Sequence, residues 1–283
     1  MTVEQHGTAQ SEVCSMLARK LLMVSIGGGA FVIPSFTGSY SLFGDEQKGY
    51  IELYSSGTLT FSTSATVDIF AVGGGSAGKA GRDKLNTGEG GSSGYTQTYK
   101  KVELDKGEYE VAIGSGGTTS AASGGESYIL DYRALGGTIT GGGSSGGGYY
   151  TYRLAHPPGL TERANAISDG NVDNSTEFVT SQHRTTRAFE EADGILYAGG
   201  GGCGGLFNSS QYKVDAAGKS GASGGGGNGQ YYNSSISYIP TAGTANTGSG
   251  GGGGGSISNG SSAGSTKKFG AGGSGLVIVR WGY

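Results

Sequence analysis

The sequence is poor in the residue types on which catalytic and metal sites usually depend. Only 14% of its 283 residues are charged, cysteine occurs twice, histidine three times, and the formal net charge is −3. No basic patch favours nucleic acid, and no basic amphipathic stretch favours a lipid surface. Cys14 and Cys203 make no ligand spacing with the histidines, so we expect two unpaired thiols and no bound metal.

Long apolar runs are also missing. The most apolar stretch, LLMVSIGGGAFVI at 21–33, is short and interrupted by glycines, so we expect no membrane-inserted segment. The N-terminus reads MTVEQHGTAQSEV, without a basic region leading into an apolar one, which predicts no signal peptide. Hydrophobic residues make up 34% of the chain, too few for a usual side-chain core. With 62 residues, glycine is the only candidate to fill the remainder.

One motif resembles a nucleotide site. Gly73, Gly78 and Lys79 match the phosphate-loop pattern G-x-x-x-x-G-K-[ST], and the strand-like VDIFAV precedes them. The hydroxyl residue that binds Mg²⁺ is replaced by Ala80, and no helical periodicity follows to direct a helix N-terminus at a phosphate. In so glycine-rich a chain the pattern arises by chance, so we predict no nucleotide cofactor.

Other candidate sites are equally incomplete. Asp169–Asp173 resembles a calcium loop but lacks its glycine and its bidentate glutamate. His156 and His183 have no neighbouring nucleophile or second ligand, and Glu190–Glu191 is typical of a charged turn. We therefore predict that the chain is not an enzyme and has no cofactor.

The glycines favour a specific packing. A glycine chain can adopt the polyproline II helix, and such helices pack side by side only where no Cβ separates them. Many runs bonded in one lattice between β-layers would offset the high ordering entropy of glycine. The runs lie at 73–75, 114–117, 141–143, 146–148, 199–202, 224–227 and 250–255. We expect a mainly β fold with packed polyglycine II helices, a glycine-rich sandwich.

Short segments around these runs predict strands and one helix. AFVIPSF, GSYSLFG, GYIELYSSGTLTFS, ATVDIFAV, SYILDYRAL and GLVIVRWGY are rich in β-branched and aromatic residues, and residues 95–113 predict a hairpin. Residues 11–24 predict an amphipathic helix, either a docking and oligomerising element or a poorly ordered tail. The predicted organisation is an attachment segment at 1–25, a β-rich region at 26–72, and a glycine-rich domain at 73–283 with a loop-rich insertion at about 149–185.

Tyrosine is the residue type most suggestive of recognition. Tyrosine rings with serine, glycine and asparagine neighbours have the composition of recognition loops, which suits a sugar or peptide partner. The candidate binding residues are Tyr149, Tyr150, Tyr152, Asn228, Tyr231, Tyr232, Asn233 and Tyr238. The alternative is that these tyrosines cover the glycine lattice as part of its core, and both interpretations stay open.

The order of several segments resembles the glycine-rich domain of bacteriophage and prophage tail-fibre proteins. The resemblance rests on the segments FTGSY, LYSSGTLTFS, VDIFAVGGGSAG, SGYTQTYKKVELDKGEYEVAIGSGG, TTRAFEEADGILYAGGGGCGG and FGAGGSGLVIVRWGY. It covers roughly residues 26–283 without the 149–185 region. No motif residue fixes a ligand, so no binding residue is carried over from the family.

The resemblance implies a β-framed polyglycine II sandwich at the host-contacting end of a fibre. The expected function is binding of a host cell-surface receptor, a polysaccharide or protein and most simply a glycan. The N-terminal segment would join other tail proteins, and the chain would form a homotrimer in the virion. The alternative function is a purely structural virion or tail component without a ligand.

Overall fold

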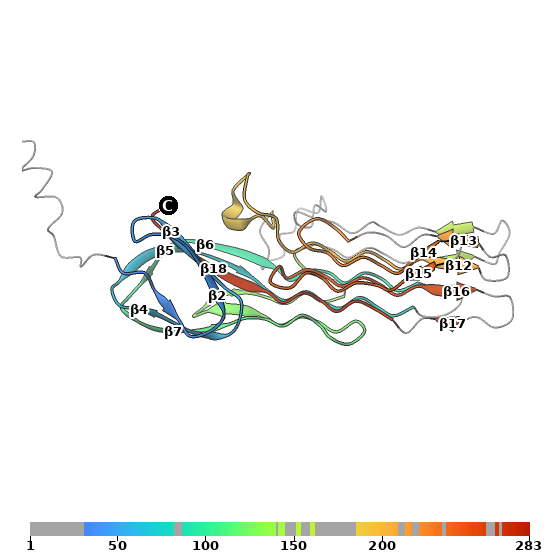
Figure 1. Cartoon of the computed structure of the whole chain (residues 1–283), viewed down its shortest axis with the longest axis horizontal. Helices are drawn as coiled ribbons and strands as arrows, with labels where there is room; N and C mark the ends of the chain where they lie inside the picture. The colour runs from blue at the N-terminus through green and yellow to red at the C-terminus, as the bar shows by residue number, and fades with distance from the viewer. Residues whose placement is uncertain are drawn as a thin grey trace, which may run out of the picture.

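The computed structural model describes residues 31–81, 87–139, 141–144, 151–153, 159–161, 185–208, 213–216, 221–233, 236–258, 264–265 and 268–283. These residues form an elongated molecule with a β-sandwich at one end and a bundle of extended glycine runs reaching to the other end (Figure 1). The predicted helix at 11–24, with Cys14, lies outside the described residues and stays a prediction. Within the described residues the only helical turn is η1 (Ala188–Glu190).

The β-sandwich consists of two five-stranded antiparallel sheets. The first sheet runs in the order β1 (Ser35–Phe36), β4 (Gly57–Phe61), β7 (Gly107–Ala112), β8 (Ser127–Ile129) and β9 (Tyr132–Ala134). The second runs in the order β2 (Tyr40–Gly44), β3 (Gly49–Leu53), β18 (Leu276–Trp281), β5 (Ala65–Val72) and β6 (Thr96–Leu104). The C-terminal strand β18 therefore lies at the centre of a sheet whose other four strands all fall within residues 40–104.

Alternating apolar residues of the two sheets form the core between them. Leu59, Phe61 and Val111 of the first sheet pack with Ile51 and Val279 of the second, and all five are at most 1% exposed. Their β-branched and aromatic composition predicted these strands, and β1–β5 and β18 confirm the prediction.

Two predicted elements differ from the structure. Residues 95–113 do not form a hairpin, because β6 pairs with β5 in one sheet and β7 pairs with β4 in the other. The turn at 105–106 leads from sheet to sheet, and an alternating pattern that buries Leu104 and Val111 in one core suits either arrangement. The segment 127–135 is two strands, not one, since Leu130 at the turn has φ 54° and reverses the chain.

The backbone amides of the glycine runs donate hydrogen bonds to three neighbouring segments in turn. In the first run, each amide donates to a different segment from the one before, and every third amide returns to the same segment. One segment accepts from Gly73, Ser76 and Lys79, through the carbonyls of Tyr95, Ser92 and Glu89 respectively. A second accepts from Gly74 and Ala77, through Gly125 and Ala122. A third accepts from Gly75 and Gly78, through Gly273 and Gly270. The amides of the first run thus donate to three neighbouring segments.

The longest run repeats this arrangement with parallel neighbours. Gly250 and Gly253 donate to Gly199 and Gly202, and Gly251 and Gly254 donate to Ser76 and Lys79. A Cβ placed on consecutive glycines of this run would also meet three different neighbours. It would lie 1.8 Å from the carbonyl oxygen of Gly91 at position 250, 2.0 Å from that of Gly270 at 251, and 1.8 Å from that of Asn228 at 252. At these glycines a side chain is excluded, so backbone of the neighbouring runs fills the space around this run.

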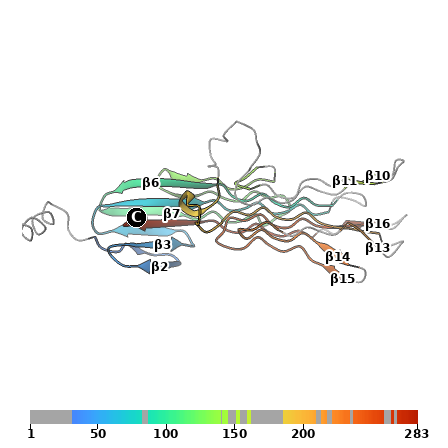
Figure 2. The same ribbon diagram turned by 90° about the horizontal axis from the view of Figure 1, so that it is seen from above.

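Short strands cap the body at the end far from the sandwich (Figure 2). They form three units: the hairpin β10 (Thr151–Arg153) with β11 (Gly159–Thr161), the hairpin β14 (Tyr231–Asn233) with β15 (Ile236–Tyr238), and a four-stranded sheet. The order in that sheet is β13 (Lys213–Ala216), β12 (Leu206–Asn208), β16 (Ser256–Ser258) and β17 (Gly264–Ser265). We call this end the distal tip.

Candidate functional site

The structure brings most of the predicted tyrosine positions to the distal tip. Tyr231, Tyr232 and Asn233 form β14, and Tyr238 of β15 lies directly opposite Tyr231 in the antiparallel register. Tyr152 lies at the centre of β10, in the second hairpin at the same end (Figure 2). Strands β10 and β14 are separated by nearly eighty residues of sequence, so their shared position follows from the glycine runs that carry them there.

The other predicted positions are separate from this group. Asn228 is exposed at the end of a glycine run, where its side-chain oxygen accepts a hydrogen bond from the Gly221 amide at 2.9 Å. The backbone amide of Asn228 donates to the hydroxyl of Thr241 at 2.8 Å. Asn228 therefore links the segments at 221 and 241 through hydrogen bonds. Tyr149 and Tyr150 lie outside the described residues and stay predictions.

A second candidate site, which sequence reasoning missed, lies where the sandwich meets the body. The loop 186–198, which includes η1, crosses the outer face of the β2–β3–β18–β5–β6 sheet. Phe189 and Tyr197 of the loop pack on Phe70 of β5, with ring centroids 5.7 and 5.5 Å apart. This second, smaller core fixes the loop over the sheet.

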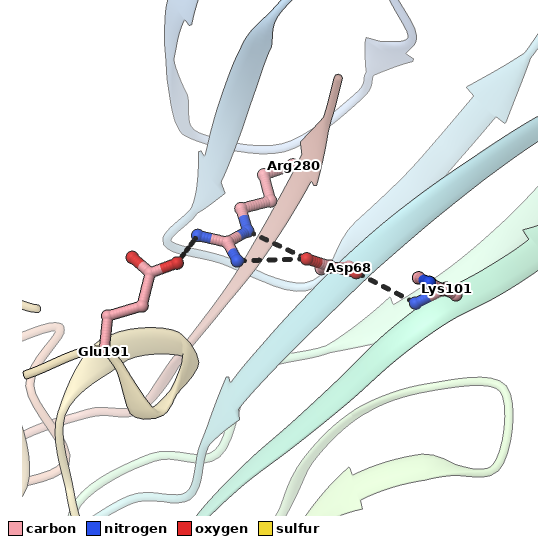
Figure 3. A network of polar contacts seen from close by, with 4 residues as sticks. All are labelled: Asp68, Lys101, Glu191 and Arg280. Atoms are coloured by element: carbon pink, nitrogen blue, oxygen red, sulfur yellow. Dashed lines mark hydrogen bonds and ion pairs between the residues drawn. The ribbon is translucent and has the colours of Figure 1, made fainter. Parts of the chain in front are cut away.

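Arg280 of β18 is the central side chain of this junction (Figure 3). Its Nε and Nη2 contact Oδ2 of Asp68 at 3.1 and 3.0 Å, and its Nη1 contacts Oε1 of Glu191 at 2.7 Å. The guanidinium carbon lies 3.8 Å from the ring centroid of Phe189. The arginine side chain is only 8% exposed, so its charge is satisfied within the protein.

Strand register explains how the Arg280–Asp68 pair forms. The two residues are direct partners in the antiparallel β18–β5 ladder, where opposite charges stabilise a cross-strand pair. A β-bulge opposite Asp68 places Lys101 at φ 55°, and the Lys101 amide donates to Oδ1 of Asp68 at 2.8 Å. A lone charge in each of two apolar strands, VDIFAV and LVIVRW, was the signal in the sequence that could have predicted this pair.

A pocket of about 220 Å³ opens beside Arg280, between the loop and the sheet. Its lining includes Tyr50, Glu52 and Tyr283 from the sandwich and Asp193 and Tyr197 from the loop. Burial, with a smaller contribution from the charge of Glu52, raises the pKa of the Tyr197 hydroxyl, so this group stays neutral and able to form hydrogen bonds. We call this the junction pocket.

The incomplete motifs of the sequence have structural roles where they are described. Lys79 forms an ion pair with Glu89 at 2.9 Å within the glycine body, and Glu191 holds Arg280. Asp169–Asp173, His156 and His183 lie outside the described residues. Among the described residues no group of three or more metal-ligating side chains gathers, and no helix is long and apolar enough to cross a membrane.

Comparison with known proteins gives a family. No curated protein matches the sequence. The family model described as "Glycine-rich domain" matches residues 54–282, which extend from just before β4 to the end of β18 and contain the whole glycine body. The chain belongs to this glycine-rich domain family.

Proposed function

We propose that this chain is a fibre or tip protein of a bacteriophage or phage-like particle, and that its distal tip binds a host surface polymer, most simply a glycan. The observation that carries the proposal is the separation of two ends. The body takes β10–β11 and β14–β15 to one end, while the C-terminal strand returns to the sandwich at the other (Figures 1 and 2). One end is then available for attachment and the other for recognition.

We also infer that the glycine runs are polyglycine II helices. Polyproline II geometry has three residues per turn, which matches the return of each hydrogen-bond partner at every third residue in runs 73–79 and 250–255. The backbone contacts that exclude a Cβ on three sides support the same inference. A body held by backbone bonds along its length is suited to carrying tip hairpins away from an attachment point.

The composition of the tip supports recognition over a purely structural role. Tyr152, Tyr231, Tyr232 and Tyr238 provide aromatic groups with hydroxyls, and Asn233 adds an amide. Hairpins joined at the ends of a regular body can vary without disturbing it, because connecting segments tolerate changes that packed elements do not.

The proposal is tested by binding of fluorescently labelled protein to a panel of intact bacterial cells, with soluble cell-wall polysaccharides as competitors. We expect saturable, strain-selective binding that a polysaccharide abolishes. The combined variant Tyr152→Ser, Tyr231→Ser and Tyr232→Ser should bind at least about tenfold more weakly, since aromatic anchors dominate such interfaces. The control is Tyr128→Ser, at a half-buried tyrosine of β8 in the sandwich. Equal binding by the tip variant and the wild type would remove the tip from the proposal, and folded protein that binds no cell would overturn the adhesin function.

We further propose that the chain forms a homotrimer through residues 1–25. The edge strand β2 exposes Tyr40, Leu42 and Phe43, an apolar edge of the kind that proteins usually cover. Light scattering should give three times the 28.3 kDa mass of one chain, and removal of residues 1–25 should lower the mass to that of one chain. A single-chain mass for the full-length protein would contradict the trimer.

A further inference from the structure

The junction pocket has the features of a binding site that the proposed tip function does not use. Its lining residues belong to the sandwich and the loop 186–198, whereas β10–β17 lie at the opposite end of the molecule (Figures 1 and 2). Its walls come from three separate parts of the chain: β3, the loop 186–198, and β18 with the residues after it. Small-molecule sites are concave pockets that often lie where separate structural units meet.

The size and walls of the pocket suit one ring-sized group. Its volume of about 220 Å³ lies below the roughly 300–1,000 Å³ typical of pockets for drug-sized ligands. Tyr50 is held rigid on one side by stacking on Phe43, with centroids 4.7 Å apart and planes 20° apart. Ile195, 64% exposed, adds an apolar group to the lining. Rigid aromatic and aliphatic surfaces can pack against the apolar C–H face of a sugar ring.

The charge of the pocket favours a cation. The guanidinium of Arg280 is committed to Asp68 and Glu191, and its flat faces are covered by Phe189 and by Tyr283 at 4.6 Å. The remaining charged groups in the lining are Glu52 and Asp193, both carboxylates. Glu52 accepts a hydrogen bond from the hydroxyl of Tyr54, which orients it. The lining has no uncommitted positive charge to receive an anionic ligand.

The loop 186–198, which forms one side of the pocket, is also held in an uncommon backbone conformation. Phe189 and Glu190 are consecutive non-glycine residues at φ 56° and φ 60°. Such residues persist only where surrounding packing enforces them, and they concentrate at ligand sites. Here the conformation places the Phe189 ring on Arg280 and leads directly into Glu191, which closes the ion pair.

We propose that the junction pocket binds an amino sugar, a pyranose unit whose amine is protonated. The ammonium group meets the carboxylates of Glu52 and Asp193. The ring packs against Tyr50, and sugar hydroxyls bond to the neutral hydroxyl of Tyr197. The chemistry distinguishes this ligand from a neutral or N-acetylated sugar, in which the positive charge is absent.

The test is calorimetric titration of the full-length protein with methyl β-glucosaminide, methyl N-acetyl-β-glucosaminide and Nα-acetyl-lysine methylamide. We expect methyl β-glucosaminide to bind in about the millimolar range and at least about tenfold more tightly than the other two. The affinity should fall with added salt, since an exposed charge interaction is screened. Equal binding of the acetylated sugar would overturn the role of charge, and equal binding of the lysine amide would overturn recognition of the ring.

Single and combined variants distinguish binding at the junction pocket from binding at the distal tip. Asp193→Asn, at an exposed loop position, should weaken methyl β-glucosaminide about tenfold without a change in melting temperature. The matched control is Glu108→Gln, an exposed carboxylate of β7 in the other sheet. The combined tip variant should keep full affinity for methyl β-glucosaminide. If Asp193→Asn and Glu108→Gln bind alike, or if no probe binds the wild type, the junction pocket is not an amino-sugar site.

Discussion

Replacing Gly252 by alanine is expected to lower the free energy of unfolding by at least about 3 kcal/mol. The new Cβ would lie 1.8 Å from the carbonyl oxygen of Asn228 and 2.4 Å from its carbonyl carbon. Both atoms belong to the backbone of a neighbouring run, so no side chain can rotate away. Separating the two runs would also stretch the bonds that Gly252 and Gly227 make to Thr241 and Gly250. Denaturant unfolding followed by circular dichroism measures the change.

The control for Gly252 is Gly107→Ala at the start of β7. A Cβ there would find its nearest atoms at 3.9 Å, an ordinary contact, so we expect a change within about 0.5 kcal/mol. Both substitutions remove similar entropy from the unfolded chain, and their difference therefore reports the folded lattice. Similar stability for the two variants would show that the glycine runs tolerate a side chain and are not packed backbone to backbone.

The Arg280→Ala variant is expected to lose about 3–5 kcal/mol of stability. Asp68, whose side chain is 13% exposed, would keep the Lys101 amide but lose both contacts to the guanidinium. An uncompensated buried carboxylate is costly, and Phe189 would lose the flat group on which it stacks. Thermal and denaturant unfolding of the purified variant measure the loss.

Two further variants separate the buried from the exposed half of this network. Glu191→Gln should cost less than about 1 kcal/mol, because the Glu191 side chain is 46% exposed and solvent screens its charge. The double variant Asp68→Leu with Arg280→Met should be more stable than Arg280→Ala alone, since no buried charge is left unpaired and the unpaired Glu191 is 46% exposed to solvent. If Arg280→Ala costs no more than Glu191→Gln, the buried pair does not hold the junction.

Strands of the sandwich could be predicted from the sequence because they are rich in β-branched and aromatic residues. VDIFAV and LVIVRW are visible as buried strands without knowledge of their partners. Their pairing could not be predicted, because β18 inserts between β3 and β5 across more than two hundred residues. For the same reason the turn at 105–106 was mistaken for a hairpin, since its local pattern is identical in both topologies.

The candidate sites also differ in whether their residues are close together in the sequence. Tyrosine composition predicted Tyr231, Tyr232 and Tyr238 as candidate binding residues, because they are close in sequence and follow a glycine run, but it did not predict that they form the hairpin β14–β15. The junction pocket could not be predicted, since Glu52, Asp193 and Tyr283 meet only after the sheet and the loop have assembled. Asn228 is predicted as a binding residue from its neighbours, and this stays a prediction; its exposed side chain accepts a hydrogen bond from the Gly221 amide.

The threefold rotation of hydrogen bonds restricts how this body can change length during evolution. One or two residues inserted into run 250–255 would turn every later amide toward the wrong neighbour, whereas three residues would restore each direction. The adjoining runs would have to lengthen together, because each bonds to several others. In the proposed polyglycine II geometry the allowed step is roughly 9 Å. Reach can therefore change only in shared, discrete increments, while the hairpins at the tip can diverge one residue at a time.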